Sequence, residues 1–341
     1  MATTKTESVR KLVFNAILHG EYLPGDAIPA EREMAVLTDT SRITVRRAYS
    51  QLEKAGILER RQGRGTSIRT DPRGNRGAME QIALLFSLRT PFALEAVEVF
   101  EREIARRDAV MILKLTGDDP RRESREAIDL VARGIRNLIV WPSGTGFNAQ
   151  VFSRLRILGA NIVFFDRAMP GDYADFVGLD ERHAIRTLMA DVRRCGIRHL
   201  SAVSFEPART LPLQQRERHI ASECERAGIE HRLHRVPFCG RIDGKLRANR
   251  RKWFPPGAGR GSICINDEIA VAVRAVCGRQ MPVWGLDGLP IAAEAGITSY
   301  SQPIAKMARR AIEMLEGQNR RGRRWKARRS LLRGRLVGPT G

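Results

Sequence analysis

Apolar residues near the N-terminus recur at helical spacing in three short segments. The first apolar face comprises Val9, Leu12, Val13, Ala16 and Ile17, which predicts an amphipathic helix. A second, shorter helix is predicted over residues 31–37, with Met34 and Leu37 turned inward. A third begins after Ser41, a residue suited to cap a helix, and its apolar face consists of Val45, Ala48, Tyr49 and Leu52. The chain therefore begins with a small, mainly helical domain.

The third helix also has a polar face, and two short strands follow it. Its first turns expose Arg42, Thr44, Arg46 and Arg47. After the helix ends, the pattern predicts two short strands at residues 57–61 and 66–69, joined by a turn at residues 62–65. In helix-turn-helix proteins such a helix enters the major groove of DNA. The pattern therefore predicts a DNA-binding domain with a two-stranded wing.

The resemblance to a known family is carried by residues 20–66, which read GEYLPGDAIPAEREMAVLTDTSRITVRRAYSQLEKAGILERRQGRGT. This segment resembles the winged helix-turn-helix domain of the GntR superfamily, and the resemblance covers residues 5–70. It implies DNA contacts at Arg32, Arg42, Thr44 and Arg46, and a wing tip at Gly63 and Arg64. Two positions depart from the family pattern. Ala30 replaces a serine N-cap, at a cost of about 1 kcal/mol, and Ile43 replaces a residue that is often polar.

The pattern changes after residue 80. Residues 1–70 form the predicted DNA-binding domain, and residues 71–80 lack apolar periodicity and predict a flexible linker. From residue 81, short apolar runs alternate with amphipathic helices. Strands are predicted at residues 82–86, 110–113, 138–141, 162–165, 200–203, 233–236, 263–265 and 283–286, and helices between them include 94–106, 184–195, 217–227, 267–277 and 304–315. Such alternation predicts doubly wound parallel sheets.

The second part of the chain, residues 81–341, is long for one sheet, so we expect two α/β subdomains with a cleft between them. The motifs at 177–180, 195–200, 227–229, 266–270, 285–287 and 301–303, together with Arg216, resemble the LacI-type effector domain over residues 82–337. That domain is similar to periplasmic sugar-binding proteins. The resemblance implies a closing strand at 331–337, approached by a basic surface run at 320–329. A nucleic-acid-binding tail is the alternative interpretation of this run.

Several polar side chains follow predicted strands and are candidates to hold a ligand. Asp180, Asn266, Asp287 and Gln302 each come just after a strand, and Arg216 lies in a loop or first helical turn facing the same cleft. Carboxylate, amide and guanidinium groups together pair well with neighbouring hydroxyls, which favours a sugar. The alternative for Asp180 and Asp287 is a helix cap or turn.

Aromatic and further polar candidates complete this ligand set. Phe92 and Trp141 could cover the apolar face of a sugar, although core packing is the alternative for both. Ser87 and Arg89 follow the first strand, and Arg89 would suit an acidic sugar.

Composition agrees with a nucleic-acid partner. The formal net charge is +21, which favours polyanions. No apolar run is long enough to span a membrane, so we expect a cytoplasmic protein. Paired carboxylates in a cleft could do acid/base chemistry, so an α/β enzyme fused to a DNA-binding domain is one alternative. However, the sequence contains no nucleophile elbow, P-loop or metal-ligand cluster, and Lys245, Lys252 and Lys306 lack the setting of a cofactor lysine. We therefore expect no catalysis, cofactor or metal.

These observations together predict a transcriptional regulator similar to the arabinose-repressor class of the GntR superfamily. We expect a repressor whose affinity for DNA is controlled by a small molecule, in particular a sugar, bound between two subdomains. Because one recognition helix makes few base contacts, we expect a homodimer on a near-palindromic operator. A DNA-binding protein with a degenerate, ligand-free cleft is a further alternative.

Overall fold

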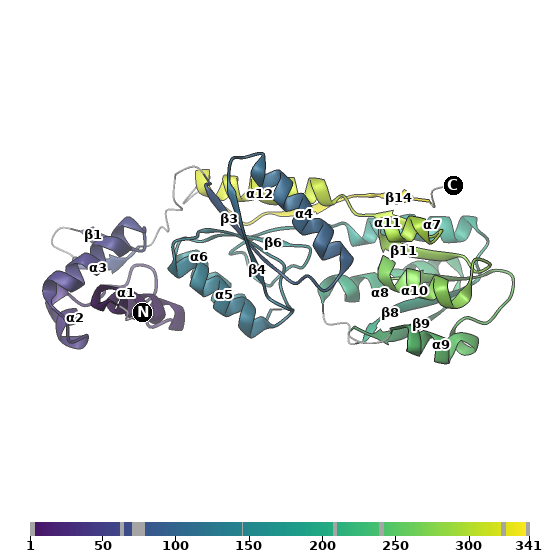
Figure 1. The fold of residues 1–341 in the computed structure, drawn as a ribbon, viewed down its shortest axis with the longest axis horizontal. Coiled ribbons are helices and arrows are strands. Elements are labelled where there is room, and N and C mark those ends of the chain that lie inside the picture. Colours follow the sequence, from purple (N-terminus) through teal and green to yellow (C-terminus); the bar gives the residue numbers. More distant parts are fainter. Residues whose placement is uncertain are drawn as a thin grey trace.

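The computed structural model describes residues 4–61, 65–69, 79–144, 146–206, 210–238, 242–321 and 325–338. Three bodies follow one another along its longest axis (Figure 1): a small N-terminal domain and two α/β subdomains. Most of the predicted linker, and the wing residues Gly63 and Arg64, lie outside the described residues.

The N-terminal domain has the predicted elements. They are α1 (Lys5–His19), α2 (Glu31–Leu37), α3 (Arg42–Lys54) and the antiparallel pair β1 (Leu58–Arg61) and β2 (Gly65–Ile68). The hydroxyl of Ser41 caps α3 by accepting a hydrogen bond from the Thr44 backbone N–H at 3.1 Å. At Ala30 only half a capping box forms, because the Glu33 carboxylate accepts the Ala30 N–H at 3.0 Å while alanine has no oxygen to return the bond.

The predicted apolar faces of this domain are largely correct, with two exceptions. The four predicted residues of α3 are all buried. Leu12 and Leu37, however, are 43% and 68% exposed, so their predicted burial is wrong. In the two-turn helix α2, Met34 and Ala35 are the buried residues, and the last turn extends beyond the small core.

The first α/β subdomain is a six-stranded sheet in the order β13-β7-β6-β5-β3-β4, with every pair parallel. Its strands are β3 (Gln81–Phe86), β4 (Val110–Leu115), β5 (Asn137–Val140), β6 (Asn161–Phe165), β7 (Asp175–Leu179) and β13 (Arg329–Leu332). The helices α4 (Pro91–Ala105) and α12 (Ile304–Arg321) pack together over one apolar core. The other core lies under α5 (Pro120–Ala132) and α6 (Ala149–Ile157).

The second subdomain has a six-stranded sheet in the order β14-β12-β11-β10-β8-β9. Its strands are β8 (His199–Glu206), β9 (Glu230–Pro237), β10 (Arg260–Cys264), β11 (Val283–Asp287), β12 (Thr298–Ser301) and β14 (Arg335–Val337), and only β14 is antiparallel to its neighbour. Helix α7 (Glu181–Arg194) packs on α8 (Leu211–Ala227), and α9 (Ile242–Trp253) packs on α10 (Asp267–Cys277), while α11 (Pro290–Glu294) contacts α10. The fold class is therefore the predicted one.

The C-terminal strand differs from its prediction. Instead of one strand at 331–337, the chain forms β13 in the first sheet and β14 in the second. Gly334 lies between them, and a Cβ at this position would be 1.8 Å from the Ser301 carbonyl oxygen. The close approach of two backbones at this crossing therefore requires glycine. Strands β7 and β12 lie outside the predicted strand ranges, although Asp180 and Gln302 were expected to follow strands at these positions.

Asp175 ties the C-terminal return of the chain to the first sheet. Its fully buried carboxylate accepts hydrogen bonds from the Gln318 amide at 2.9 Å and the Trp325 indole at 3.2 Å. It also accepts the Arg328 backbone N–H at 2.7 Å. One carboxylate thus joins β7, α12 and the approach to β13, and the basic run at 320–329 is in part a structural segment.

We expect Asp175→Ala to lower the free energy of unfolding by about 3–5 kcal/mol, because it leaves several buried polar groups unpaired. Urea denaturation followed by circular dichroism would measure the change. The exposed neighbour Asp172 provides a matched control, and Asp172→Ala should change stability by less than about 0.5 kcal/mol. Equal unfolding midpoints for the two variants would contradict this role of Asp175.

Candidate functional site

The exposed face of α3 presents the arginines that the sequence singles out. Arg42, Arg46 and Arg47 are exposed, and Arg32 is exposed on α2. The Thr44 hydroxyl shares a hydrogen bond with the Ser41 hydroxyl at 2.9 Å, and Ile43 is 64% exposed beside them. The beginning of α3 therefore exposes both cationic and apolar side chains.

Glu31 organises this surface in a way that the sequence does not reveal. Its carboxylate accepts hydrogen bonds from Arg46 at 3.0 Å and from Arg60 at 2.7 Å. Arg60 lies on β1, so one carboxylate joins α2, α3 and the wing. Glu31 and Arg60 lie far apart in the chain, and no sequence pattern connects them. Arg46 is therefore held in place before any partner approaches, which lowers the entropy cost of a later contact.

A cleft separates the two α/β subdomains at the carboxyl ends of their strands. Its cavity of about 60 Å³ is lined by residues that include six of the predicted ligand-binding set: Phe92, Trp141, Arg216, Asn266, Asp287 and Gln302. Parallel strands end at the same edge of a sheet, so groups that are far apart in sequence meet there. The cavity also includes Asp166 and Arg167, which the prediction did not include.

Three predicted ligand residues lie elsewhere. Asp180 caps α7 by accepting the His183 backbone N–H at 3.0 Å, and it pairs with Arg333 at 3.0 Å. The hydroxyl of Ser87 donates to Asp118 at 3.1 Å. Arg89 is exposed and does not line the cavity. For Asp180 the helix cap, which the sequence left open as an alternative, is the structure that forms.

Arg216 is the centre of the cleft. Its guanidinium donates two hydrogen bonds to Glu181, at 2.8 and 3.0 Å, and a third to the Ile265 carbonyl at 2.8 Å. The Asp287 Oδ1 lies 4.0 Å from the Arg216 Nη1. Burial by itself would lower the pKa of Arg216, but the charge and hydrogen bonds of Glu181 raise it above its usual value. The arginine is therefore a fixed cation beneath the cleft.

Carboxyl groups outnumber this cation. Burial raises the pKa values of Asp166, Glu181 and Asp287, and the charge of Arg216 opposes the rise at each of them. Burial also raises the pKa of Asp267, which accepts the Ser299 hydroxyl at 2.6 Å. An anionic ligand would be repelled by the ionised form of these carboxyl groups. A hydroxyl or amine group of a ligand could instead donate hydrogen bonds to them.

Backbone strain and unpaired polar atoms mark the same place. Asp166 and Asp287 adopt φ values of 63° and 138°, which residues with side chains rarely adopt. The Gln302 amide nitrogen donates to Asp287 at 2.8 Å, while its oxygen is buried without a partner among the described residues. The buried Trp141 indole N–H likewise makes no hydrogen bond of normal geometry to a described residue. A weaker hydrogen-bonding interaction of this N–H with Asp166 nevertheless lowers the pKa of Asp166. The cleft thus retains one buried acceptor without a partner, the Gln302 oxygen, and one donor, the Trp141 N–H, that interacts only weakly with Asp166.

Phe92 and Trp141 both pack against other aromatic rings and line the cavity. Trp141 packs edge-on against Phe92, with ring centroids 5.6 Å apart, and against Phe86 in the core. The Arg167 guanidinium lies over Trp141, 5.2 Å from the ring centroid, and it pairs with Asp118 at 3.1 Å. Asp166 and Arg167 directly follow the strand β6. The rule that selected Asp287 could therefore also have selected them.

Other site types can be assessed for the described part of the chain. No group of three or more His, Cys, Asp or Glu side chains within it is arranged to hold a metal ion. None of the described helices is both long and apolar enough to cross a membrane.

The raised pKa of Asp287 generates a prediction about stability. A carboxyl group whose folded pKa lies above its unfolded value favours folding at low pH, and this contribution is lost as pH rises through the folded pKa. We therefore expect Asp287→Asn, which keeps the acceptor for Gln302, to raise the unfolding temperature at pH 8 by on the order of 2–4 °C. The gain should disappear at pH 4. Thermal unfolding at both pH values would measure it, and a gain of the same size at both would contradict the assignment.

Comparisons with known proteins agree with this geometry. Residues 5–68 match the family of bacterial regulatory proteins called the gntR family. The uncharacterized HTH-type transcriptional regulator YhcF of Bacillus subtilis (strain 168) is 45% identical over 56 residues, which are 16% of this chain and 46% of that protein. The arabinose metabolism transcriptional repressor of Geobacillus stearothermophilus is 23% identical over 334 residues, covering 90% of this chain and 89% of the repressor.

Among solved structures, a periplasmic binding protein/LacI transcriptional regulator from Alkaliphilus metalliredigens QYMF, complexed with D-xylulofuranose, has a TM-score of 0.64 at 14% identity. It covers 77% of this chain and 99% of that chain. At this identity the likeness concerns the fold alone. The chain therefore carries a DNA-binding domain of the gntR family at its N-terminus, followed by two α/β subdomains with the fold of LacI regulators and periplasmic binding proteins.

Proposed function

We propose that this protein is a transcriptional repressor whose affinity for operator DNA is controlled by a neutral sugar bound between the two α/β subdomains. The observation that carries the proposal is the cleft around Arg216. There, carboxyl and amide groups and an indole from both subdomains converge beside two strained aspartates. A relative that matches most of the chain is named an arabinose metabolism repressor, which supports the same function.

The chemistry of the cleft favours a neutral sugar over a sugar acid. Each hydroxyl group both donates and accepts hydrogen bonds, so it suits the unpaired Gln302 oxygen and the unpaired Trp141 N–H. Both arginines that line the cavity are already paired with carboxylates, Arg216 with Glu181 and Arg167 with Asp118. The carboxyl groups of Asp166 and Asp287 line the same cavity and oppose an anionic ligand, and Arg89, which would have suited one, lies outside it. The sugars in the names of the two compared proteins, arabinose and D-xylulofuranose, both have five carbons.

The small volume of the cavity has a consequence for binding. About 60 Å³ is well below the roughly 300–1,000 Å³ of typical ligand pockets. We infer that the two subdomains separate to admit the sugar and close around it. The hinge would be the described segments 179–181, 301–304 and 332–335, where the chain passes between the two sheets.

The assembly that we propose is a homodimer on a near-palindromic operator. Helix α3 has 13 residues, and only its first turns present base-reaching side chains. Two copies related by a two-fold axis would read two half-sites, which provides the affinity that one helix lacks. We propose residues 1–70 as the DNA-binding domain, 71–80 as the linker and 81–341 as the ligand-binding domain. The same proposal implies a cytoplasmic protein that binds its ligand without turning it over.

We expect Arg42→Ala to weaken binding to the operator by about 1–3 kcal/mol without changing the fold, if Arg42 makes a bidentate contact to a base. Electrophoretic mobility shifts at fixed salt, with nonspecific DNA as competitor, would measure the loss. Arg122, an exposed arginine on α5, provides the matched control because Arg122→Ala removes the same charge far from α3. An equal loss on operator and nonspecific DNA would show that Arg42 contacts phosphate instead of bases.

We expect a neutral five-carbon sugar to raise the unfolding temperature of the full chain, because a ligand at 100 times its Kd stabilises the folded state by about 2.7 kcal/mol. A thermal-shift series of L-arabinose, D-xylulose and their acids would test this. Trp141→Phe, which removes the indole N–H together with one ring of the indole but keeps an aromatic side chain, should weaken binding by roughly tenfold. Trp253→Phe outside the cleft should leave binding unchanged. Stabilisation by the acids alone, or by none of the compounds, would contradict the proposal.

A further inference from the structure

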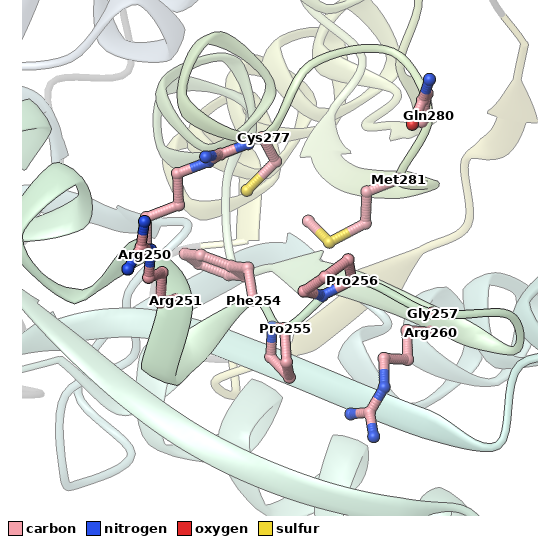
Figure 2. Close-up of a pocket in the computed structure, with 10 residues that line it drawn as sticks. All are labelled: Arg250, Arg251, Phe254, Pro255, Pro256, Gly257, Arg260, Cys277, Gln280 and Met281. Carbon is pink, nitrogen blue, oxygen red and sulfur yellow. The ribbon is translucent and has the colours of Figure 1, made fainter.

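A cavity much larger than the cleft lies at the opposite end of the second subdomain. Its volume is about 560 Å³, and it is formed by the segment that joins α9 to β10 and by the segment that joins α10 to β11 (Figure 2). Both segments lead into strands, so the cavity lies at the amino ends of the parallel strands, whereas the cleft lies at their carboxyl ends. The two sites share no lining residue.

Helix α10 lies between the cavity and the cleft. Asn266 caps the beginning of this helix and lines the cleft, while Cys277 ends the helix and lines the cavity. Eleven helical residues span roughly 16 Å. The cavity is therefore not an extension of the cleft, although one rigid element touches both.

The middle of the cavity is apolar. Figure 2 shows Phe254, Pro256 and Met281 gathered at its centre, with the Cys277 thiol beside them. Phe254 is buried, and burial raises the pKa of Cys277 to about 11, against the opposing charge of Arg250. The thiol is thus uncharged at neutral pH and belongs to the apolar wall. Such a wall binds hydrocarbon, because contact removes apolar surface from water.

The edge of the cavity is cationic. Arg250 and Arg251 lie on one side and Arg260 on the other (Figure 2). None of these three forms an ion pair with another of the described residues, and no carboxylate is among the residues that line the cavity. Arg216 in the cleft, by contrast, is paired with Glu181. Here the positive charge is available to a partner from outside.

We propose that this cavity is a second ligand-binding site, which takes a small organic anion with an apolar body, such as an aromatic or aliphatic carboxylate, sulfonate or phosphate monoester. The apolar part would contact Phe254 and Met281, while the acid group would pair with guanidinium groups at the edge. Guanidinium groups bind such oxyanions through two parallel hydrogen bonds. The volume lies within the range of about 300–1,000 Å³ for small-molecule sites.

The geometry favours this ligand over the other candidates. A sugar would find few side-chain acceptors, because Gln280 is the only residue lining the cavity whose side chain has an oxygen atom. A second copy of the chain, placed on this surface by a two-fold axis, would bring two arginine edges together and so repel. The proposal depends on neither the sugar nor the operator, so it can fail or succeed independently of the proposed function.

The test uses 8-anilinonaphthalene-1-sulfonate, a fluorescent organic anion with an apolar body, titrated into the full-length protein. We expect saturable binding that weakens at least tenfold in the double variant Arg250→Ala/Arg260→Ala. Arg247→Ala removes an exposed arginine of the same helix that does not line the cavity, and this control should bind the probe as the wild type does. Cys277→Trp, which fills the cavity and keeps its charges, should abolish binding.

Two further measurements make the result decisive. Naphthalene-1-sulfonate should displace the probe, whereas the uncharged 1-naphthalenemethanol at the same concentration should not. Circular dichroism would confirm that each variant is folded, and the double arginine variant decides the outcome should Cys277→Trp fail to fold. Unchanged binding in the double variant, or equal displacement by the uncharged compound, would overturn the proposal. So would an arginine-dependent dimer in sedimentation that binds no probe, because the surface would then be an interface between copies.

Discussion

One buried cation organises the second subdomain and the cleft. Arg216 on α8 binds Glu181 at the start of α7 and the carbonyl of Ile265 at the end of β10, and it lies close to Asp287 at the end of β11. Removing one partner of such a buried pair costs about 3–5 kcal/mol, because the remaining charge is left without compensation. The positions of two helices and two strand ends thus depend on a single guanidinium group.

The same cation links the two subdomains. Asp166 follows β6 in the first subdomain, and burial raises its pKa. The charge of Arg216, in the second subdomain, makes this rise smaller. Separation of the subdomains would expose this carboxyl group to water and weaken its attraction to the arginine. In the closure that we propose, the ionisation of these carboxyl groups would be coupled to the closed state, and a ligand that donates hydrogen bonds to them would favour that state.

Charge is distributed differently in the three bodies of the molecule. In the N-terminal domain, Glu31 holds Arg46 and Arg60 in fixed positions beside the exposed start of α3. In the cleft, Arg216 and Arg167 are each paired with a carboxylate, and Asp166 and Asp287 line the same cavity. At the far end of the second subdomain, arginines stand around an apolar cavity without carboxylates. The high net charge of +21 is thus not one uniform basic surface, and each region presents a different arrangement of charge.

Features that depend on local periodicity and on residues adjacent in the chain could be predicted from the sequence. The α3 cap and its buried face, the two-stranded wing, and the alternation of strands and helices follow from spacing alone, since short-range contacts decide them. Placing polar residues at strand ends also located Asn266, Asp287 and Gln302 in the cleft, because parallel strands end at a common edge. Asp180 was misplaced by the same rule, since a residue after a strand can equally cap the next helix.

Only the tertiary structure decided which distant groups meet. Glu31 with Arg60, Asp175 with Gln318, and Arg216 with Glu181 are contacts between residues that no sequence period relates. The division of the last strand into β13 and β14 likewise depends on the backbone of Ser301 passing beside Gly334. The physical reason is that hydrogen bonds and charge interactions act over a few ångströms in space, whatever the separation along the chain, so their partners are set by packing and not by local pattern.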